Sequence, residues 1–555
     1  PGGPVFLAAT SNPDRIEAPV TARAYFLCVF ASFGGIFFGY DTGWMGGVLA
    51  MPFFIKLITG LDQATTPASD FVVPAWKQSL MTSILSAGTF FGALIAGDVA
   101  DFFGRRITII TGCIVFAIGC ILETASHSLG LLVAGRLIAG FGVGFISAII
   151  ILYLSEIAPR KVRGAIVSGY QFCITIGILL ANCVVYATQN RNDTGSYRIP
   201  IAVQFLWAII LGTGLILLPE SPRWYVKKGR VDAAARALSR VRGQPQDSTY
   251  VQEELAEIVA NFEYESELIP NTGYFDSWAQ CFTGGLRNPA SNLRRTILGT
   301  SIQMMQQWTG VNFIFYFGTV FFTALGTISN PFLISLITTL VNVLSTPISF
   351  YTIERFGRRP ILIWGAVGMF VCEFICAILG VAKPNDDNVT KAQIALICIY
   401  IAFFASTWGP AAWVIVGETF PIPIRSRGVA LSASSNWLWN CIITVITPYM
   451  VGPTKGNLKS RVFFIWGSTC VLCAVYSYFC VWETKGLSLE QVDRMMEETG
   501  APWRSVGWKP QTTYAAQMGL TEDGALPIKG SEDVQVDEKA HPAVGTKHLR
   551  GKQTV

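Results

Sequence analysis

Charged side chains are scarce in this sequence of 555 residues: Asp, Glu, Lys and Arg make up 14% of it, whereas hydrophobic residues make up 51%. The mean hydropathy of +0.45 is too high for a water-soluble protein of this length. The low charge content therefore excludes an ordinary soluble fold and predicts a membrane protein with the lipid bilayer as its main partner.

Residues that could build a catalytic or metal centre are also few. The sequence has three His and thirteen Cys, and neither type shows metal-ligand spacing. Every Cys except Cys281 lies in an apolar run, where cysteine behaves as a small hydrophobic residue rather than as part of a disulfide framework. Because no nucleotide-binding loop or pair of nucleophile and base is present either, we expect no enzyme activity, no metal and no cofactor. The net charge of +5 is explained by the loops and requires no nucleic acid.

Long apolar runs are what the sequence has in abundance. Twelve are long enough to span a bilayer, in two groups of six separated by a polar interval. The chain begins with Pro1 and shows no cleavable signal pattern, so we expect the natural start to be missing and the first span to act as the insertion signal. The expected parts are an N-terminal segment (1–23), an N-terminal six-helix bundle (24–219), a helical linker (220–295), a C-terminal six-helix bundle (296–482) and a largely disordered tail (483–555).

The distribution of Lys and Arg predicts the orientation of the chain. These residues are concentrated in the loops that lie on the same side as both termini, which the positive-inside rule assigns to the cytosol. The two Asn-X-Thr sequons, at Asn192 and Asn388, fall in loops that this topology places outside. The linker and the start of the tail are expected to form short amphipathic helices at 231–242, 251–265 and 488–498.

The two groups of spans share internal repeats. Phe-Gly-Arg-Arg occurs at 103–106 and again at 356–359, and Glu220 has a counterpart in Glu483. Both halves therefore carry the same loop motifs, as expected for two parallel six-helix repeats that face each other across a central cavity.

The seventh span contains the most informative stretch, Gln-Gln-Trp-Thr-Gly-Val-Asn at 306–312. A regular helix turns about 100° per residue, so Gln307 and Asn312 would point well apart. We expect the helix to unwind at Thr309 and Gly310, which would bring the amides of this stretch to one side. Broken helices with polar groups near the membrane midplane are typical of transporter binding sites.

Uncharged amides and aromatic residues recur inside other spans. Side chains that both donate and accept hydrogen bonds, beside flat aromatic faces, suit a neutral polyhydroxylated ligand better than an ion or a lipid. The alternative is that the amides only hold helices together, at about 0.6 kcal/mol each, which is a stronger alternative for any single amide than for the cluster. The predicted substrate-binding residues are Phe38, Gln171, Gln306, Gln307, Asn312, Asn342, Trp413 and Asn436.

One carboxylate, Asp41, lies well inside the first span, and Arg136 is the strong charge expected to meet it in the N-terminal half. An acid at this depth costs about 2.5 to 3.5 kcal/mol on an insertion scale, so it must face a cavity, a cation or a proton. A proton switch that parts from Arg136 is one interpretation, and a static ion pair that locks the helices is the other.

Charged motifs also lie at the cytosolic ends of spans. Opposite charges there could bridge the two halves in one state and separate in another, although positive-inside anchoring would account for some of the Arg residues. The predicted gating residues are Arg105, Arg106, Glu156, Arg163, Glu220, Arg223, Tyr316, Arg358, Arg359, Glu418 and Arg425.

Over 21–498 the sequence resembles the sugar porter family of the major facilitator superfamily, most closely the fungal high-affinity hexose transporters. The motifs that carry the resemblance are Phe-Gly-Tyr-Asp (38–41), Gly-Arg-Leu (135–137), Ser-Glu-Ile-Ala-Pro (155–159), Pro-Glu-Ser-Pro-Arg (219–223), the stretch at 306–312, Glu-Arg-Phe-Gly-Arg-Arg (354–359) and Ser-Asn-Trp (435–437). The final motif departs from the family, since Trp482 stands where Pro is usual.

The resemblance implies an all-α membrane protein with twelve transmembrane helices in two six-helix pseudo-repeats. It also implies that the predicted amides hold a sugar above Trp413, and that Asp41 and Arg136 couple protons in the family's symporters. The expected function is hexose uptake, with glucose as the expected substrate, across the plasma membrane by alternating access and proton symport, carried out by a monomer. Two alternatives remain open: a facilitator with the same site, since such proteins also keep an acid in the first span, and a sugar sensor that binds without transport.

Overall fold

The computed structural model describes seven segments of the chain, and the ends of both predicted terminal segments, 1–18 and 515–555, lie outside them. The tail predicted to be largely disordered spans 483–555, and its residues 515–555 lie outside the described segments. The described segments are 19–67, 71–268, 274–325, 330–384, 386–452, 455–511 and 513–514.

The N-terminal half consists of six spans and one short helix, α3 (Pro52–Thr59), which begins with a proline in its first turn. Its first span is interrupted at Phe33, where α1 gives way to α2. The bounds of the spanning helices are α1 (Ala22–Ser32), α2 (Gly34–Val48), α4 (Ala75–Phe103), α5 (Arg105–Thr124), α6 (Leu129–Ile157), α7 (Arg163–Thr188), preceded by the 3-10 turn η1 (Arg160–Val162), and α8 (Gly195–Leu215).

The C-terminal half repeats this plan with more interruptions. Three of its spans are made of two helices each, broken at Gly310, at Pro347 and at Thr407. The bounds are α13 (Asn292–Trp308), α14 (Val311–Leu325), α15 (Pro331–Ser345), α16 (Ile348–Phe356), α17 (Arg358–Ala382), α18 (Asp387–Ser406), α19 (Trp408–Thr419), α20 (Arg425–Val451) and α21 (Val462–Cys480), preceded by η3 (Lys459–Arg461).

Within the described segments, ten spans pass as long and apolar enough to cross a membrane, and α15 with α16, bent by 41°, forms an eleventh if counted as one. The pair α13 and α14 lies among them in the bundle and completes the twelve spans expected from the sequence. Large apolar side chains such as Ile114 and Leu217 are exposed on the bundle, which suits contact with lipid.

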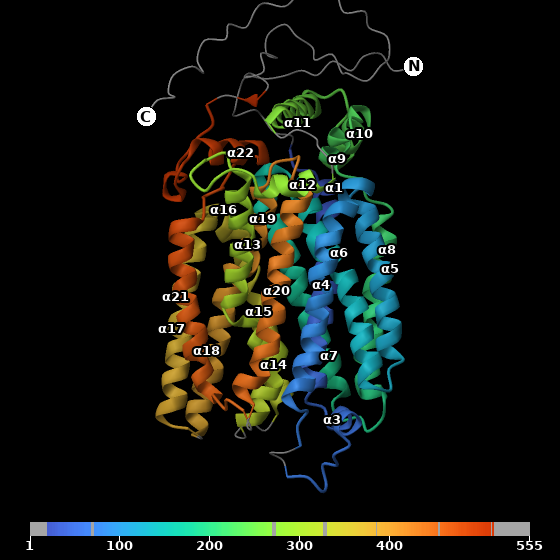
Figure 1. Cartoon of the computed structure of the whole chain (residues 1–555), viewed down its shortest axis with the longest axis vertical. Helices are drawn as coiled ribbons and strands as arrows, with labels where there is room; N and C mark the ends of the chain where they lie inside the picture. The colour runs from blue at the N-terminus through green and yellow to red at the C-terminus, as the bar shows by residue number, and fades with distance from the viewer. Residues whose placement is uncertain are drawn as a thin grey trace, which may run out of the picture.

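Short helices gather at one end of the bundle, here called the linker end, while α3 lies at the opposite end (Figure 1). The helix expected at 231–242 is confirmed with the same bounds, and those expected at 251–265 and 488–498 are confirmed within a few residues. The bounds are α9 (Pro222–Lys227), α10 (Val231–Arg242), α11 (Thr249–Leu268), α12 (Tyr274–Ala279), η2 (Gln280–Phe282), α22 (Leu489–Glu498) and η4 (Pro502–Arg504).

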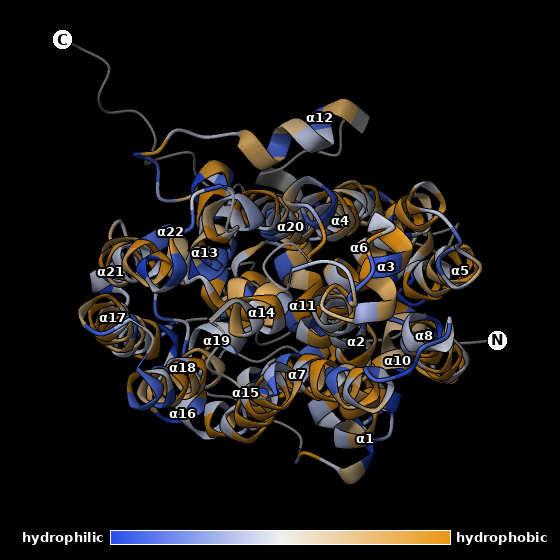
Figure 2. Ribbon diagram, turned by 90° about the horizontal axis from the view of Figure 1, so that it is seen from below, coloured by the Kyte–Doolittle hydropathy of each residue, from blue (hydrophilic) through white to orange (hydrophobic). Residues whose placement is uncertain are grey.

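The two halves lie side by side when the bundle is viewed along its length (Figure 2), and α4 packs on α20 while α7 packs on α15 at the boundary between them. The internal repeat read from the sequence is also present in the contacts. Glu220 accepts hydrogen bonds from the backbone N–H groups of Arg105 and Arg106, both at 3.0 Å. Glu483 receives the equivalent bonds from the second Gly-Arg-Arg turn, at 3.0 and 3.1 Å.

Candidate functional site

A cavity lined by residues of both halves lies between them. All eight side chains predicted to bind substrate line it, and so does Tyr316, which was assigned to gating. Four further residues with polar or aromatic side chains that were not among those predictions also line it: Thr42, Phe315, Phe404 and Asn440.

The break in the seventh span brings its amides to the cavity, as expected. Helix α13 ends at Trp308, and Gly310 has a φ of 79°, a left-handed conformation that favours glycine. Tyr400 supports the break from behind, because its hydroxyl donates to the carbonyl of Thr309 at 2.7 Å. Because the helix restarts at Val311, the side chains of Gln306, Gln307 and Asn312 all reach the same cavity.

Most amides of the cluster already bond to one another. Asn436 Nδ2 donates to Oε1 of Gln303 at 2.6 Å and to Oε1 of Gln306 at 2.8 Å. The Nε2 of Gln306 donates to the carbonyl of Gly409 at 2.8 Å, so this side chain also holds the start of α19 in place. Gln307 Oε1 accepts from Asn312 and, at 3.3 Å, from Asn440. These bonds fix the orientation of the amides before any ligand binds.

Asn342 does not take part in this network of bonded amides. Its side chain on α15 is 1% exposed and lines the cavity, yet neither Oδ1 nor Nδ2 has a hydrogen-bond partner among the described residues. The hydroxyl of Tyr316 is also unpartnered in this part of the chain. A buried amide without a partner costs about 1 to 3 kcal/mol, which a ligand hydroxyl could recover by bonding to it.

Aromatic side chains form the remaining walls. Trp413 is held edge-on against Tyr170, with ring centroids 5.9 Å apart, and Phe38 packs edge-on against Trp437 at 5.0 Å. Flat apolar faces beside fixed donors and acceptors match the two surfaces of a monosaccharide ring.

Asp41 and Arg136 lie behind the cavity wall rather than in it. Both are fully buried, but the structure contains no ion pair between them within the described residues. Arg136 donates from Nε to the carbonyl of Met81 at 2.7 Å, and its guanidinium lies 5.0 Å from the ring centroid of Trp44. Arg136 was expected to be the only strong charge able to meet Asp41 in this half, and this is wrong, because Glu123 is also fully buried beside them.

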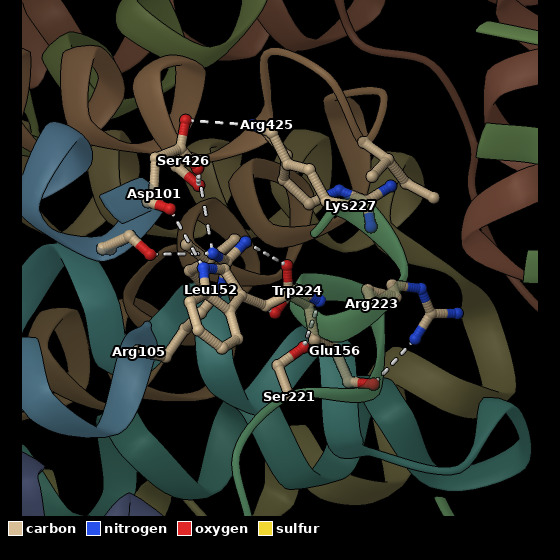
Figure 3. Close-up of polar contacts among 12 residues, drawn as sticks. Asp101, Arg105, Leu152, Glu156, Ser221, Arg223, Trp224, Lys227, Arg425 and Ser426 are labelled. Carbon is tan, nitrogen blue, oxygen red and sulfur yellow. Dashed lines mark hydrogen bonds and ion pairs between the residues drawn. The ribbon is translucent and has the colours of Figure 1, made fainter. Parts of the chain in front are cut away.

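The predicted gating charges gather at the linker end, where they pair mainly within one half. Arg105 donates to both carboxylate oxygens of Glu156 at 2.8 and 2.9 Å, and Arg358 donates to Glu418 at 2.9 and 3.3 Å. Figure 3 shows the first of these pairs among its neighbours. The expectation that these opposite charges bridge the halves is therefore not met by these two pairs, since each joins helices of the same half.

Other contacts do connect the halves. Arg427 in α20 lies 3.1 Å from Asp98 and 3.4 Å from Asp101 in α4, and Ser426 also bonds to Asp101 (Figure 3). Sequence reasoning did not select these acids, although both stand shortly before the first Gly-Arg-Arg turn. Arg163 donates to the carbonyl of Leu487 at 3.4 Å, which joins α7 to the segment that precedes α22.

The linker and the segment after the last span add further contacts at the linker end. Arg223 in α9 pairs with Glu490 in α22 at 2.7 Å. Burial alone would raise the pKa of Glu490, but the neighbouring Arg223 guanidinium outweighs it and holds that pKa below its usual range. Arg425 donates to the carbonyl of Phe420 at 2.7 Å and lies 3.9 Å from Asp493. The side chains of Arg106 and Arg359 bond to carbonyls at the ends of neighbouring spans, of Leu218 and Tyr478.

The two halves also touch at the opposite end. A Cβ placed on Gly46 of α2 would lie 2.6 Å from the carbonyl oxygen of Tyr316 on α14, so these two helices touch through their backbones. The cavity therefore lies between halves that are in contact at both ends of the bundle.

Comparison with known proteins agrees with this geometry. The family model described as "Sugar (and other) transporter" matches residues 27–496. The chain belongs to this sugar transporter family. This match confirms the resemblance seen in the sequence. The chain is a protein of a transporter family with the all-α major facilitator fold, and not an enzyme.

Three curated fungal relatives are similar over most of this chain. The major facilitator-type transporter ecdD of Aspergillus rugulosus is 46% identical, over 91% of this chain and 94% of that protein. The high glucose sensor RGT2 of Saccharomyces cerevisiae is 40% identical over 85% of this chain, but the match spans only 60% of the sensor. The probable glucose transporter rco-3 of Neurospora crassa is 38% identical over 94% of this chain and 87% of that protein.

A solved structure of the proton:xylose symporter XylE, with 6-bromo-6-deoxy-D-glucose bound, superposes with a TM-score of 0.72. It covers 86% of this chain and 99% of its own, at 24% sequence identity, which establishes the shared fold.

Proposed function

We propose that this family member transports a hexose, with glucose as the first candidate, across the plasma membrane by alternating access and proton symport. The observation that carries the proposal is the cavity between the halves, which is lined by prearranged amides together with the unpartnered side chain of Asn342. This donor and acceptor pattern suits a neutral polyhydroxylated ligand. Names among the relatives support the choice of glucose, since rco-3 is described as a probable glucose transporter.

The orientation of the chain is part of this proposal. The linker end, with its many Arg side chains and the helices α9 to α12 and α22, would face the cytosol, together with both termini. Asn192 and Asn388 are exposed at the opposite end, as the proposed extracellular side requires for the two sequons.

Proton coupling is proposed for Asp41, whose fully buried carboxyl lies next to the cavity residue Thr42. Asp41 would take a proton from outside, weaken its interaction with Arg136 and allow the halves to rock inward. One coupled proton would add about 2.3 kcal/mol per 100 mV of membrane potential, plus the pH gradient.

The test is radiolabelled glucose uptake into proteoliposomes, with and without an inward proton gradient, for the unaltered protein and Asp41→Asn. Concentrative uptake that requires the gradient and is lost in the variant, while sugar exchange across the membrane remains, supports symport. Uptake that only equilibrates and ignores the gradient would identify a facilitator and make Asp41 a structural residue.

A sensor is the second candidate, because a glucose sensor is 40% identical to this chain. The match leaves two fifths of that sensor's length uncovered. Binding of glucose with neither uptake nor exchange in the same proteoliposomes would favour the sensor.

A further inference from the structure

The buried charge cluster behind the cavity contains two acids and one base. Asp41 on α2, Glu123 on α5 and Arg136 on α6 are each 0% exposed, and each carboxylate interacts electrostatically with the guanidinium. Glu123 lies against α6, since a Cβ placed on Gly135 would come 2.8 Å from its Cγ. Three charged groups from three spans of the N-terminal half therefore share one interior site.

The hydrogen-bond capacity of this cluster is largely unused. The oxygens of Glu123 have no close hydrogen-bond partner among the described residues, although the Gln204 amide lies near them, and Nη1 and Nη2 of Arg136 and Oδ2 of Asp41 are also unpartnered. The neutral amide of Gln204 on α8, oriented to satisfy both of its groups, donates to Oδ1 of Asp41 at 2.9 Å and accepts from Trp44 Nε1 at 3.2 Å. Groups left free in this way can change partners when a proton arrives or leaves.

A coupling site made of Asp41 and Arg136 alone has an electrostatic difficulty. Protonation of Asp41 would leave a fully buried guanidinium without a counter-ion, at a cost of several kcal/mol. Two ionised acids beside one base are unfavourable too, because the cluster would then carry an excess negative charge in a low-dielectric interior. The net charge of the three groups is zero when the two acids hold one proton between them.

We propose that Glu123 is a second member of the proton-coupling site: it shares one proton with Asp41 and serves as the counter-ion of Arg136 whenever Asp41 is protonated. This inference rests on the proposed symport. In the cycle, the proton enters on one acid while the other stays ionised beside Arg136. Its departure toward the cytosol leaves both acids ionised with an excess negative charge, and entry of the next proton from outside relieves this state. Arg136 thus keeps one carboxylate partner throughout.

The position of Glu123 suits entry of the proton from outside. It is the penultimate residue of α5, whose last turn lies at the end opposite the linker, whereas Asp41 is near the middle of α2. The titratable or charged groups that act on the cluster are Arg136 from α6, Asp41 from α2, the Cys120 thiol on α5 itself and the Tyr316 hydroxyl from α14.

The test is the pH dependence of gradient-driven glucose uptake in proteoliposomes containing the full chain. In Glu123→Gln, Asp41 becomes the sole counter-ion of Arg136 and stays ionised to lower pH, so the pH of half-maximal uptake is expected to fall by about one unit, a tenfold change in proton concentration. Glu123→Asp is expected to shift it in the same direction by less, since a shorter carboxylate balances Arg136 less closely. Equilibrium glucose binding of each variant verifies that it is folded.

Glu373→Gln is the matched control. Glu373 on α17 is a carboxyl of the C-terminal half with 2% exposure, and its oxygens likewise lack a partner within the described segments. Its replacement is expected to leave the pH of half-maximal uptake unchanged.

The outcomes separate this inference from the symport on which it rests. If the unaltered protein shows no gradient-driven accumulation, both proposals fail. If it accumulates sugar and the Glu123 variants keep the same half-maximal pH, or lose uptake equally at every pH, Glu123 is structural and only the present inference is overturned.

Discussion

Asn342 offers the cavity a buried amide whose oxygen and nitrogen both lack a partner among the described residues. Replacement by Leu, which is close in size but cannot hydrogen-bond, is expected to weaken glucose binding about 10- to 100-fold, because one or two bonds to the ligand are lost. Equilibrium binding of labelled glucose to the purified protein measures the effect.

Asn182→Leu provides the control for this change. Asn182 is a buried amide on α7 that donates to the carbonyl of Ile178 at 2.9 Å and does not line the cavity. If both variants bind glucose as tightly as the unaltered protein, Asn342 has no part in recognition.

The sequence predicts the cavity residues well because a bilayer permits few polar side chains without a reason. The amides at 306, 307, 312 and 436 stand out within apolar runs, and the structure brings them together. Glu123 does not stand out, because it lies at the last turn of α5, where the sequence suggests the end of a span and a charge appears inexpensive. Only the packing of α5 against α6 buries it.

Gly310 determines the shape of the central element, the broken span α13–α14. Its φ of 79° costs an L-residue about 1 to 2 kcal/mol, and an added Cβ would lie 2.5 Å from the indole Cγ of Trp466. Gly310→Ala is therefore expected to lower the melting temperature and to weaken glucose binding by at least about tenfold, since Gln307 and Asn312 would no longer share one side.

Gly318→Ala on α14 is the matched variant, because the nearest atoms to an added Cβ are 3.6 Å away, an ordinary contact distance. It is expected to bind glucose normally. Normal binding by Gly310→Ala as well would mean that the break does not organise the site.

The elements themselves were predictable to different degrees. The unwinding at Thr309 and Gly310 could be read from the sequence because amides on different faces of one helix required it. The 41° bend between α15 and α16 was not predicted, although Pro347 lies at that point. A proline signals a bend, but its size depends on how neighbouring helices pack.

The contact between α11 and α22 contains a pair of buried carboxyls with a pH-dependent interaction. Burial raises the pKa of Glu265 well above its usual range, and the adjacent Asp493, which is paired with Arg295 at 2.5 Å, raises it further. The docked state therefore keeps a proton that an undocked Glu265 would release above about pH 4.3. The free energy that holds α22 against α11 is therefore expected to weaken as pH rises above about 4.3 toward the raised pKa of Glu265. The loss is up to about 1.4 kcal/mol per pH unit.

Glu265→Gln mimics the protonated acid and should abolish this dependence. Hydrogen exchange of α22, corrected for intrinsic rates, is expected to quicken as pH rises above about 5 in the unaltered protein and to stay flat in the variant. Glu263→Gln, on the exposed side of the same helix, should behave like the unaltered protein. Equal pH dependence in all three would show that Glu265 is ionised when docked.

On the scale of the whole molecule, the structure joins the two halves at both ends. At the linker end the contacts are ionic and involve side chains, such as Arg427 with Asp98, whereas at the opposite end two backbones meet at Gly46. Ion pairs between side chains can separate and re-form as the halves rock. The backbone contact at Gly46 cannot adjust in this way, because it forms only when residue 46 has no side chain.

Gly46→Val is therefore expected to hold the end opposite the linker open, because an added Cβ would lie 2.6 Å from the carbonyl oxygen of Tyr316. Sugar should still bind from that side, while uptake and exchange fall at least about tenfold, since alternating access requires both ends to close in turn. Binding and uptake are measured in the same proteoliposomes.

Gly130→Val is the control, since an added Cβ there meets nothing within 4 Å. Uptake at the unaltered rate in Gly46→Val would mean that the halves close outside without this backbone contact, and that the rocking axis lies elsewhere.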